Sequence, residues 1–268
     1  MISHKDKFKG MTALVTGGSS GIGLEFATQL AQYGINLLIV SNQEQSLKEV
    51  AFDIANKYHV KTYYLYKDLA SENAAASIFN FCTENKIKID ILINNAGIFT
   101  FKQFTKHSIS QLNTYINLHI RCLTELCHIF GRDMKRNGMG YILNMSSMSC
   151  WMPMPGISMY TATKAYIRVL SRSLYLEFKD YNISVTVACP GGIATDLFGL
   201  PDKLQRLGVN LGVLVTPRKF VAKALSRMFR KKTQYINGTF NRFSIFCVAI
   251  LPSQIKMLIK HRLLDRNE

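Results

Sequence analysis

Short, almost wholly apolar runs alternate with longer helical patterns along most of the chain, and this alternation constrains the fold more than any other feature. Apolar runs with little internal alternation are typical of strands that helices cover on both faces. Strands that alternate with helices are joined by right-handed crossovers and form a parallel sheet. The sequence therefore predicts an α/β fold with a doubly wound parallel sheet. The expected strands cover residues 11–16, 35–40, 61–66, 89–94, 141–146 and 183–188.

The extent of this pattern indicates one domain rather than two. Strands and helices alternate without a break to about residue 190. A stretch punctuated by Gly and Pro follows at about 191–216, then one helix near 217–231 and an apolar tail at about 240–268. A chain of 268 residues, 48% of them hydrophobic, is long enough for one large α/β core. We interpret residues 1–268 as a single domain with a mobile insert and a C-terminal tail.

Targeting and cysteine patterns favour a cytoplasmic protein. The N-terminal residues lack the long apolar core of a signal peptide, and no run of about 18 apolar residues predicts a membrane-spanning helix. Because the six cysteines form no CxxC pair and no metal-type pairing with histidine, we predict reduced, buried thiols and no metal site. They stand at positions 82, 122, 127, 150, 189 and 247.

The net charge of +16 is spread unevenly along the chain. The excess of Lys and Arg over Asp and Glu is 0 in residues 1–100, +5 in residues 101–200 and +11 in residues 201–268. A nucleic-acid binder usually combines such charge with base-reading or stacking motifs, and this sequence shows none. We therefore predict no nucleic-acid partner. The basic end meets an anionic small molecule, a membrane surface or only water.

A glycine-rich turn, TGGSSGIG at residues 16–23, separates the first expected strand from the first expected helix. Residues without a Cβ let backbone N–H groups approach a pyrophosphate at the helix N-terminus. Gly17, Gly21 and Gly23 give the spacing T-G-x3-G-x-G, which differs from the common G-x-G-x-x-G fingerprint. The turn predicts a dinucleotide site on a Rossmann-type fold.

A tyrosine and a lysine stand four residues apart, at Tyr160 and Lys164, just after a run rich in Met, Pro and Ser. On a helix the two side chains share a face, because four residues make about one turn. The pair is open to two interpretations. It is either a packing pair or a catalytic pair, in which the ammonium stabilises the phenolate and lowers the tyrosine pKa.

Six motifs occur in one order at suitable distances: TGGSSGIG, NNAG at 94–97, Asn117, Ser147, YTATK at 160–164 and PGGIAT at 190–195. Any one of them could arise by chance, whereas six in register could not. On these motifs the chain resembles the short-chain dehydrogenase/reductase family over roughly residues 10–235. Within that family it is similar to bacterial short-chain oxidoreductases and to 3-oxoacyl and hydroxysteroid reductases.

The resemblance implies an oxidoreductase that transfers hydride between a nicotinamide cofactor and a carbonyl or alcohol. Tyr160 would give or take the proton, and Ser147 would hold the carbonyl oxygen where charge develops. Ser146 is an alternative to Ser147, but its spacing from Tyr160 fits the family less well. Lys164 would also bind the nicotinamide ribose, and Asn117 would hold a water that links Lys164 to solvent. The alternative function is a catalytically silent NAD(P)-binding regulator or scaffold.

The resemblance also assigns a cofactor site. Asp68 and Leu69 would meet the adenine, although a lone aspartate after a strand is otherwise a turn residue or helix cap. Ile193 and Thr195 would bind the carboxamide and orient the nicotinamide ring. The expected cofactor-binding residues are Gly17, Ser19, Ser20, Gly21, Ile22, Gly23, Ser41, Asn42, Asp68, Leu69, Asn95, Ala96, Gly97, Tyr160, Lys164, Pro190, Gly191, Ile193 and Thr195.

The end of the second expected strand bears on the choice of cofactor. An acid there would bind the ribose 2′-hydroxyl of NAD. Ser41 and Asn42 stand at this place, so nothing repels a 2′-phosphate. The basic residue that many NADP-dependent relatives carry is absent as well, and Ser20 occupies the turn position where others have Arg or Lys. We predict NADP as the preferred cofactor, with NAD as the alternative.

Methionines gather around the expected catalytic serine and tyrosine, with the chain's single tryptophan among them. Because methionine adapts to irregular apolar shapes, they predict a hydrophobic ketone or acyl-chain substrate, and the family resemblance implies a 3-oxoacyl type. The stretch at about 191–216, punctuated by Gly and Pro, is interpreted as the substrate loop. Met145, in the strand, is interpreted as core. His107, His119 and His128 show no convergent pattern and are interpreted as packing or surface residues. The residues flanking the site are Met148, Trp151, Met152, Met154 and Met159.

Two segments with spare apolar positions and the C-terminal tail bear on which partners the chain contacts. Relatives commonly pair through the helix that carries Tyr and Lys and the helix before it, so residues 108–135 and 158–179 predict a homodimer or homotetramer. If residues 253–268 are helical, apolar residues fall near one face and lysines toward the other. Such a tail packs within the protein or oligomer, covers the cleft, or makes weak peripheral contact with an anionic membrane. The apolar positions are Ile255, Leu258, Ile259 and Leu263.

Overall fold

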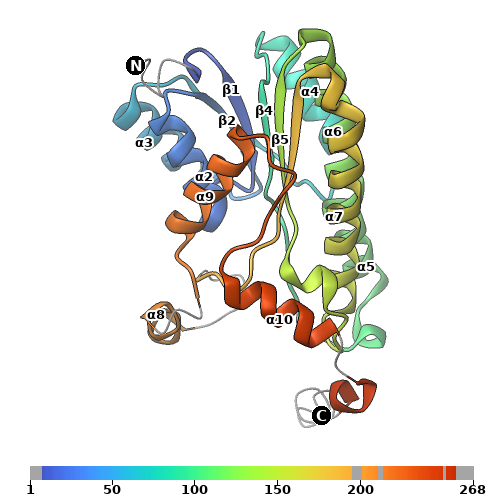
Figure 1. Ribbon diagram of the computed structural model, residues 1–268. Coiled ribbons are helices and arrows are strands. Elements are labelled where there is room, and N and C mark those ends of the chain that lie inside the picture. Colours follow the sequence, from blue (N-terminus) through green and yellow to red (C-terminus); the bar gives the residue numbers. More distant parts are fainter. Residues whose placement is uncertain (1–7, 195–200, 211–213, 250–251, 258–268) are drawn as a thin grey trace.

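The computed structural model describes residues 8–194, 201–210, 214–249 and 252–257. Its centre is a seven-stranded sheet with every pairing parallel, in the order β3-β2-β1-β4-β5-β6-β7 (Figure 1). The predicted doubly wound α/β fold is confirmed. The strands are β1 (Thr12–Thr16), β2 (Asn36–Ser41), β3 (Thr62–Tyr66), β4 (Ile91–Asn94), β5 (Gly140–Met145), β6 (Ile183–Ala188) and β7 (Gln234–Tyr235).

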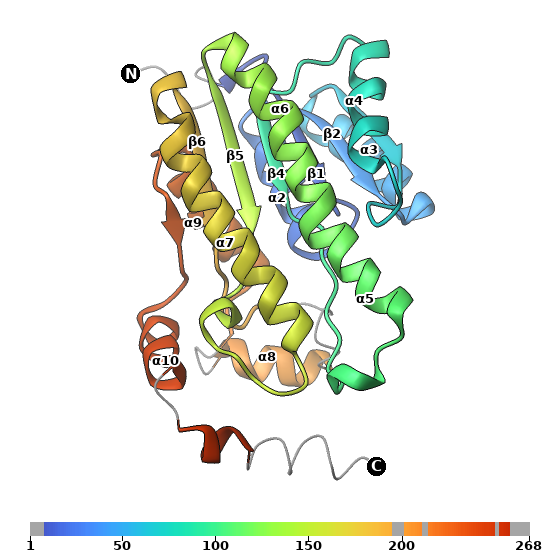
Figure 2. The same ribbon diagram turned by 90° about the vertical axis from the view of Figure 1, so that its right-hand side faces the viewer.

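Helices cover both faces of this sheet, and Figure 2 shows one of the two faces from the front. On one face lie α2, α3 and α9, and on the other lie α4, α6 and α7. The α-helices are α2 (Gly21–Gln32), α3 (Glu44–Tyr58), α4 (Ala74–Glu84), α5 (Ile109–Tyr115), α6 (Leu123–Asn137), α7 (Ser158–Phe178), α8 (Asp202–Asn210), α9 (Pro217–Phe229) and α10 (Thr239–Ala249). The short helices are η1 (Phe104–Lys106), the π-helical η2 (Ile116–Cys122), η3 (Met148–Trp151) and η4 (Lys179–Tyr181).

The apolar strands supply two cores because successive side chains point to opposite faces. Val15 and Ile39 pack with α2, α3 and α9, while Leu14 and Leu38 pack with α4, α6 and α7. All four side chains are fully buried. Each such residue contributes about 1.5–3 kcal/mol relative to an exposed position, so the continuous apolar runs suit a sheet covered on both sides.

Five of the six expected strands differ from the structure by one or two residues at an end, and the structure has one strand more than expected. The expected strand 89–94 begins at Ile91, and just before it the Asp90 carboxylate accepts a hydrogen bond from Thr12 N at 3.0 Å, at the amino end of the central strands β1 and β4. The seventh strand, Gln234–Tyr235, was not predicted. A two-residue strand leaves no apolar run to detect.

The C-terminal third adds elements to stretches expected to be irregular. Helix α8 lies inside the expected substrate loop at 191–216, and a parallel bridge between Ile193 and Val215 joins the loop's two ends. Helix α10 and a helical turn at 253–257 follow β7. Among the described residues no helix is long and apolar enough to cross a membrane. The interpretation of residues 1–268 as one domain stays a prediction.

Candidate active site

The glycine turn lies where the strand order reverses, between β1 and β4, at the carboxyl end of the sheet. Such switch points are where open α/β sheets bind ligands. A Cβ on Gly23 would lie 1.9 Å from Gly17 O, so only glycine fits there. Gly17 and Gly21 have φ values of +64° and +53°, which glycine adopts without strain. Ser20 precedes α2 without capping it through its side chain, leaving the first-turn N–H groups for an anion.

Asn95, just after β4, fixes this turn. Its side-chain amide donates to Thr16 O at 3.1 Å and Gly17 O at 3.3 Å. Its backbone N donates to the Thr16 hydroxyl, as does that of Ala96. Asn95 therefore acts on the cofactor site mainly by holding the glycine turn against β4.

A cavity of about 330 Å³ runs from the glycine turn to Tyr160 and Lys164. Sixteen of the nineteen expected cofactor-binding residues line it. Of the other three, Gly191 and Ile193 closely follow the lining residue Pro190 in the sequence but do not line the cavity themselves. Thr195 lies outside the described residues. Asp68 Oδ1 accepts from Ala70 N at 2.9 Å, so this aspartate is a turn residue and at the same time part of the cavity wall.

Sequence reasoning missed six residues that line the cavity, and Lys67 matters most among them. It follows β3, whose last residue Tyr66 is paired with Ser41, and its backbone N donates to Ser41 O at 2.9 Å. The register of two strands thus brings a cation to the end of β2, where a 2′-phosphate is distinguished from a hydroxyl. The six are Gln43, Lys67, Ile98, Leu118, Met145 and Ser146.

Polar side chains at the end of β2 form a small network. The Ser19 and Ser41 hydroxyls lie 2.7 Å apart, and the Ser19 hydroxyl is also 3.0 Å from Gln43 Oε1. Gln43 N donates to the Ser41 hydroxyl at 3.2 Å. The network contains donors but no carboxylate, which suits an anionic group better than a ribose hydroxyl alone.

Two of the catalytic candidates, Tyr160 and Lys164, line the other end of the cavity, and Ser147 is hydrogen-bonded to Tyr160 beside them. Lys164 Nζ donates to Met145 O at 2.9 Å and lies 5.6 Å from the centre of the Tyr160 ring. The Ser147 hydroxyl oxygen accepts from Ser149 N at 3.2 Å, so its own hydrogen can be donated elsewhere. Ser146 instead donates to Lys164 O at 2.7 Å, which turns it away from the chemistry and favours Ser147.

Burial sets the pKa values in this cluster. It raises the pKa of Tyr160 to about 12, and a hydrogen bond with Ser147 acts in the opposite direction. Burial also lowers the pKa of Lys164 to about 8. The expectation that Lys164 lowers the tyrosine pKa is therefore wrong for the protein alone. Removing the phenolate from water costs more than the hydrogen bond with Ser147 returns.

His119 has a role that the packing interpretation did not include. Its Nε2 accepts from Ile98 N at 3.0 Å, so the proton of the neutral ring is on Nδ1, which lies 2.9 Å from the Thr163 hydroxyl. Burial, followed by the charge of Lys164, keeps the pKa of His119 well below its usual value. The ring therefore stays neutral and connects the loop after β4 to α7. Asn117, two residues earlier, is half-buried in the π-helical segment η2.

The loop after β6 is held by two asparagines from the segment after β7. Gly191 N donates to Asn237 Oδ1 at 2.7 Å, and Asn241 Nδ2 donates to Asn237 O at 2.8 Å. Met148 N donates to Pro190 O at 2.8 Å, which connects this loop to the segment that carries Ser147. The end of the cavity at Met145, Ser146 and Pro190 is thus supported by β5, β6 and α10 together.

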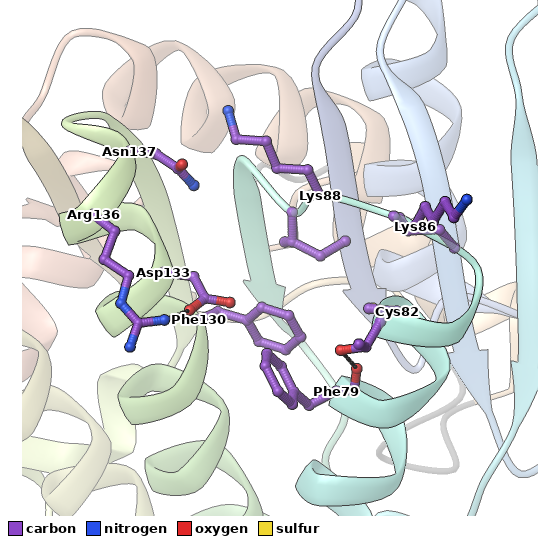
Figure 3. A pocket seen from close by; sticks show the side chains of 11 residues that line it. Phe79, Cys82, Lys86, Lys88, Phe130, Asp133, Arg136 and Asn137 are labelled. Carbon is purple, nitrogen blue, oxygen red and sulfur yellow. Dashed lines mark hydrogen bonds and ion pairs between the residues drawn. The ribbon is translucent and has the colours of Figure 1, made fainter.

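A second cavity of about 390 Å³ lies between the ends of α4 and α6, away from these groups (Figure 3). Phe79 and Phe130 meet edge to face in it with ring centres 6.1 Å apart, and Arg136 is paired with Asp133 at 3.3 Å. Its charges are largely paired and its thiol, Cys82, has a pKa raised by burial to about 12. We do not place a reaction there. The described residues also show no group of three His, Cys, Asp or Glu that could hold a metal.

Comparison with known proteins agrees with this geometry. Residues 11–203 match the short chain dehydrogenase family. The chain belongs to this family. A solved short-chain dehydrogenase from Sphingobium yanoikuyae, in complex with NADPH, is 29% identical with a TM-score of 0.77, covering 89% of this chain and 93% of its own. The glycine turn fits such a dinucleotide, because its close packing against Asn95 and Ala96 leaves no room for a Cβ at Gly17 or Gly23 and so requires the bare backbone that can approach a pyrophosphate.

Curated relatives of this short-chain dehydrogenase differ in activity. A 3-oxoacyl-(acyl-carrier-protein) reductase of Chlamydia muridarum is 32% identical over 84% of this chain and 92% of its own length. Hydroxysteroid dehydrogenase-like protein 1 of Gallus gallus is 35% identical over 69% of this chain, and the human protein of that name, called inactive, is 31% identical over 82%. The chain spans only 56% and 66% of the length of these last two relatives.

Proposed function

We propose that this short-chain dehydrogenase interconverts a hydrophobic ketone, or a 3-oxoacyl-type substrate, and the corresponding alcohol with NADP(H) as cofactor. The observation that carries the proposal is that Tyr160 and Lys164 line one end of a cavity whose other end is a glycine turn, with the Ser147 hydroxyl hydrogen-bonded to Tyr160. A phenol, a hydroxyl and an ammonium around one point can bind and protonate a carbonyl oxygen.

The bound nicotinamide supplies the hydride. Ser147 donates a hydrogen bond to the substrate oxygen, and Tyr160 gives its proton to that oxygen, so that the carbonyl becomes an alcohol. Because the pKa of Tyr160 is about 12, the phenol is fully protonated near neutral pH and ready for reduction. Lys164 holds the ribose and offsets the charge left on Tyr160. Asn117 would bind a water that returns a proton through Lys164.

The preference for NADP rests on charge at the end of β2. Ser41 and Asn42 carry no acid, and Lys67 lies on the same wall. An ammonium beside a 2′-phosphate is a charge-assisted contact, whereas a ribose hydroxyl gains little from it. The NADPH bound to the Sphingobium yanoikuyae enzyme supports the same choice.

The substrate class rests on the apolar residues near Ser147 and Tyr160. Met148, Trp151, Met152 and Met159 are all half-buried and leave adaptable apolar surface beside the reacting groups. A relative that reduces 3-oxoacyl groups, by its name, supports an acyl chain.

A second candidate function is a catalytically silent NADP(H)-binding protein. One observation favours it, namely that the human hydroxysteroid dehydrogenase-like relative is called inactive. The two functions share the cofactor cradle and differ only in turnover, so an activity measurement separates them.

The test is a panel assay that follows NADPH absorbance against ketones, 3-oxoacyl thioesters and steroids. Tyr160→Phe is the matched control, because it removes one hydroxyl and keeps the ring. We expect turnover on at least one substrate, a loss of at least about 100-fold in Tyr160→Phe, and similar NADPH binding in both proteins. NADPH binding without turnover on any substrate would favour the silent protein. Turnover that survives Tyr160→Phe would contradict the role of Tyr160.

A further inference from the structure

Large exposed apolar side chains gather at the carboxyl end of the sheet, around the mouth of the active site. They come from three separate segments: the loop at 101–107, helix α8 and helix α10. Figures 1 and 2 both place α8, α10 and the turn at 253–257 at this same end of the molecule. We call this set the aromatic rim. It consists of Phe101, Phe104, Leu204, Leu207, Phe243 and Phe246, each between 47% and 65% exposed.

The orientation of α10 is fixed by its buried side. Asn241 is 8% exposed and lies against Gly191, where it would block any side chain. At about 100° per residue, Phe243 and Phe246 point roughly opposite to Asn241 and within about 60° of each other. Their exposure of 65% and 62% follows from this geometry. The helix thus holds the active-site loop on one side and presents two phenylalanines to the outside on the other.

Basic side chains accompany the rim. Lys203 and Arg206 on α8 and Arg242 on α10 are exposed, and Lys102 and Lys256 are half-exposed. Against them, Asp202 is the single acidic residue in the sequence from 201 to 257. Exposed aromatic side chains with a surrounding excess of Lys and Arg are the chemistry that binds the surface of an anionic bilayer.

We propose that the aromatic rim docks on the surface of an anionic membrane, with the mouth of the active site facing the lipid. A second copy of this chain fits less well, because each copy carries a net charge of +16 and would bring its own basic side chains to the contact. The anionic lipid headgroups have the complementary charge. Because the rim is made of single side chains from separate segments, the proposed contact is with the surface of the bilayer.

Docking through the aromatic rim does not require turnover, but it would change how a substrate reaches Tyr160. Lys102 N donates to Gly156 O at 2.8 Å, so the loop that carries Phe101 and Phe104 is joined to the segment before Tyr160. On a membrane, the apolar entrance to Tyr160 would open toward the lipid rather than toward water. A substrate dissolved in the bilayer could then enter without crossing water.

The experiment is vesicle co-sedimentation of the full chain, with phosphatidylcholine vesicles that contain or lack phosphatidylserine, at low and moderate salt. Phe243→Ser/Phe246→Ser is the test variant. Phe52→Ser is the matched control, because Phe52 is 68% exposed on α3, away from the rim. We expect wild-type binding to phosphatidylserine vesicles that weakens with salt, a loss of at least about tenfold in the double variant, and no loss in the control. NADPH binding by each variant shows that it is folded.

Charge is tested separately by Arg206→Gln/Arg242→Gln, with Lys219→Gln/Lys223→Gln on α9 as the control. Only the first pair should weaken binding, because α9 lies on the flank of the sheet (Figure 1). The proposal would be overturned if the wild type did not bind phosphatidylserine vesicles at low salt. It would also be overturned if Phe243→Ser/Phe246→Ser bound them as well as the wild type and Phe52→Ser do. Self-association that the Phe243→Ser/Phe246→Ser variant abolishes, without vesicle binding, would make the rim an interface between copies and would also overturn it.

Discussion

Replacing the buried lysine of the site should change how the stability of the protein depends on pH. Lys164 is 4% exposed, and burial lowers its pKa from 10.5 to about 8. Between these two values the unfolded chain keeps a proton that the folded chain has released. Raising the pH through this window therefore favours the folded state. Since each pKa unit corresponds to about 1.4 kcal/mol, the full effect of Lys164 is up to about 3 kcal/mol.

The window closes near pH 10 because Tyr160 has the opposite sign. Its pKa is raised to about 12, so above its ordinary value of 10 the folded chain keeps a proton that the unfolded chain loses, and stability falls. From about pH 7.5 to about pH 9.5, Lys164 alone should add about 2 kcal/mol to the free energy of unfolding. Lys164→Met should lack this gain.

Urea unfolding without cofactor, at about pH 7.5 and about pH 9.5, measures the free energy of unfolding of the wild type and of Lys164→Met. The matched control is Lys61→Met, because Lys61 is exposed and water solvates its ammonium in both states. We expect the wild type and the control to gain about 2 kcal/mol relative to Lys164→Met as the pH rises. Equal pH dependence in all three proteins would show that Lys164 is not desolvated, and would refute the account of the site given above.

Three further predictions concern cofactor choice, thiol reactivity and assembly. Ser41→Asp should shift the ratio of kcat/KM for NADPH and NADH toward NADH. Lys67→Gln should weaken NADPH binding by about tenfold or more, with little effect on NADH binding. If neither variant changes the preference between the two cofactors, the specificity site lies elsewhere. Because a hydrogen bond with Cys189 lowers the pKa of Cys150, whereas burial raises that of Cys127 to about 12, iodoacetamide should modify Cys150 first, as peptide mass spectrometry would show. Light scattering at micromolar concentration should give a dimer or tetramer; a monomer mass would contradict pairing through α6 and α7.

The sheet could be predicted from the sequence because its strands are continuous apolar runs. Six strands were expected within two residues of where they lie, and five of them owe this to burial on both faces, whereas the edge strand β3 is partly exposed. Strand β7 and helix α8 carry no such signal. One is two residues long, and the other is amphipathic in a stretch broken by Gly and Pro. Their positions depend on partners far along the chain, such as β6 for β7.

The cofactor cradle could be predicted for a different reason, because it is built from local turns with fixed backbone requirements. Gly23 must be glycine against Gly17 O, and that demand appears directly in the sequence. Lys67 could not be found in this way. It reaches the cavity only because β3 pairs with β2 in a particular register, which no local motif records. The pKa of Tyr160 also depends on how deeply the ring is buried, and residue spacing says nothing about that.

In the mechanism that we propose, the loss of a single hydroxyl would turn an active protein into a silent one. The Tyr160 ring meets Phe99 edge to face at 5.1 Å and lies 6.3 Å from the His119 ring, and neither contact involves the phenolic oxygen. A phenylalanine at this position would keep the packing, the helix and the glycine cradle while losing the proton donor. The fold and the cofactor site therefore cannot separate the two proposed functions, whereas Tyr160, Ser147 and Lys164 can. This chain has all three, arranged around one point, and for that reason we favour turnover over silent binding even though a relative 31% identical is called inactive.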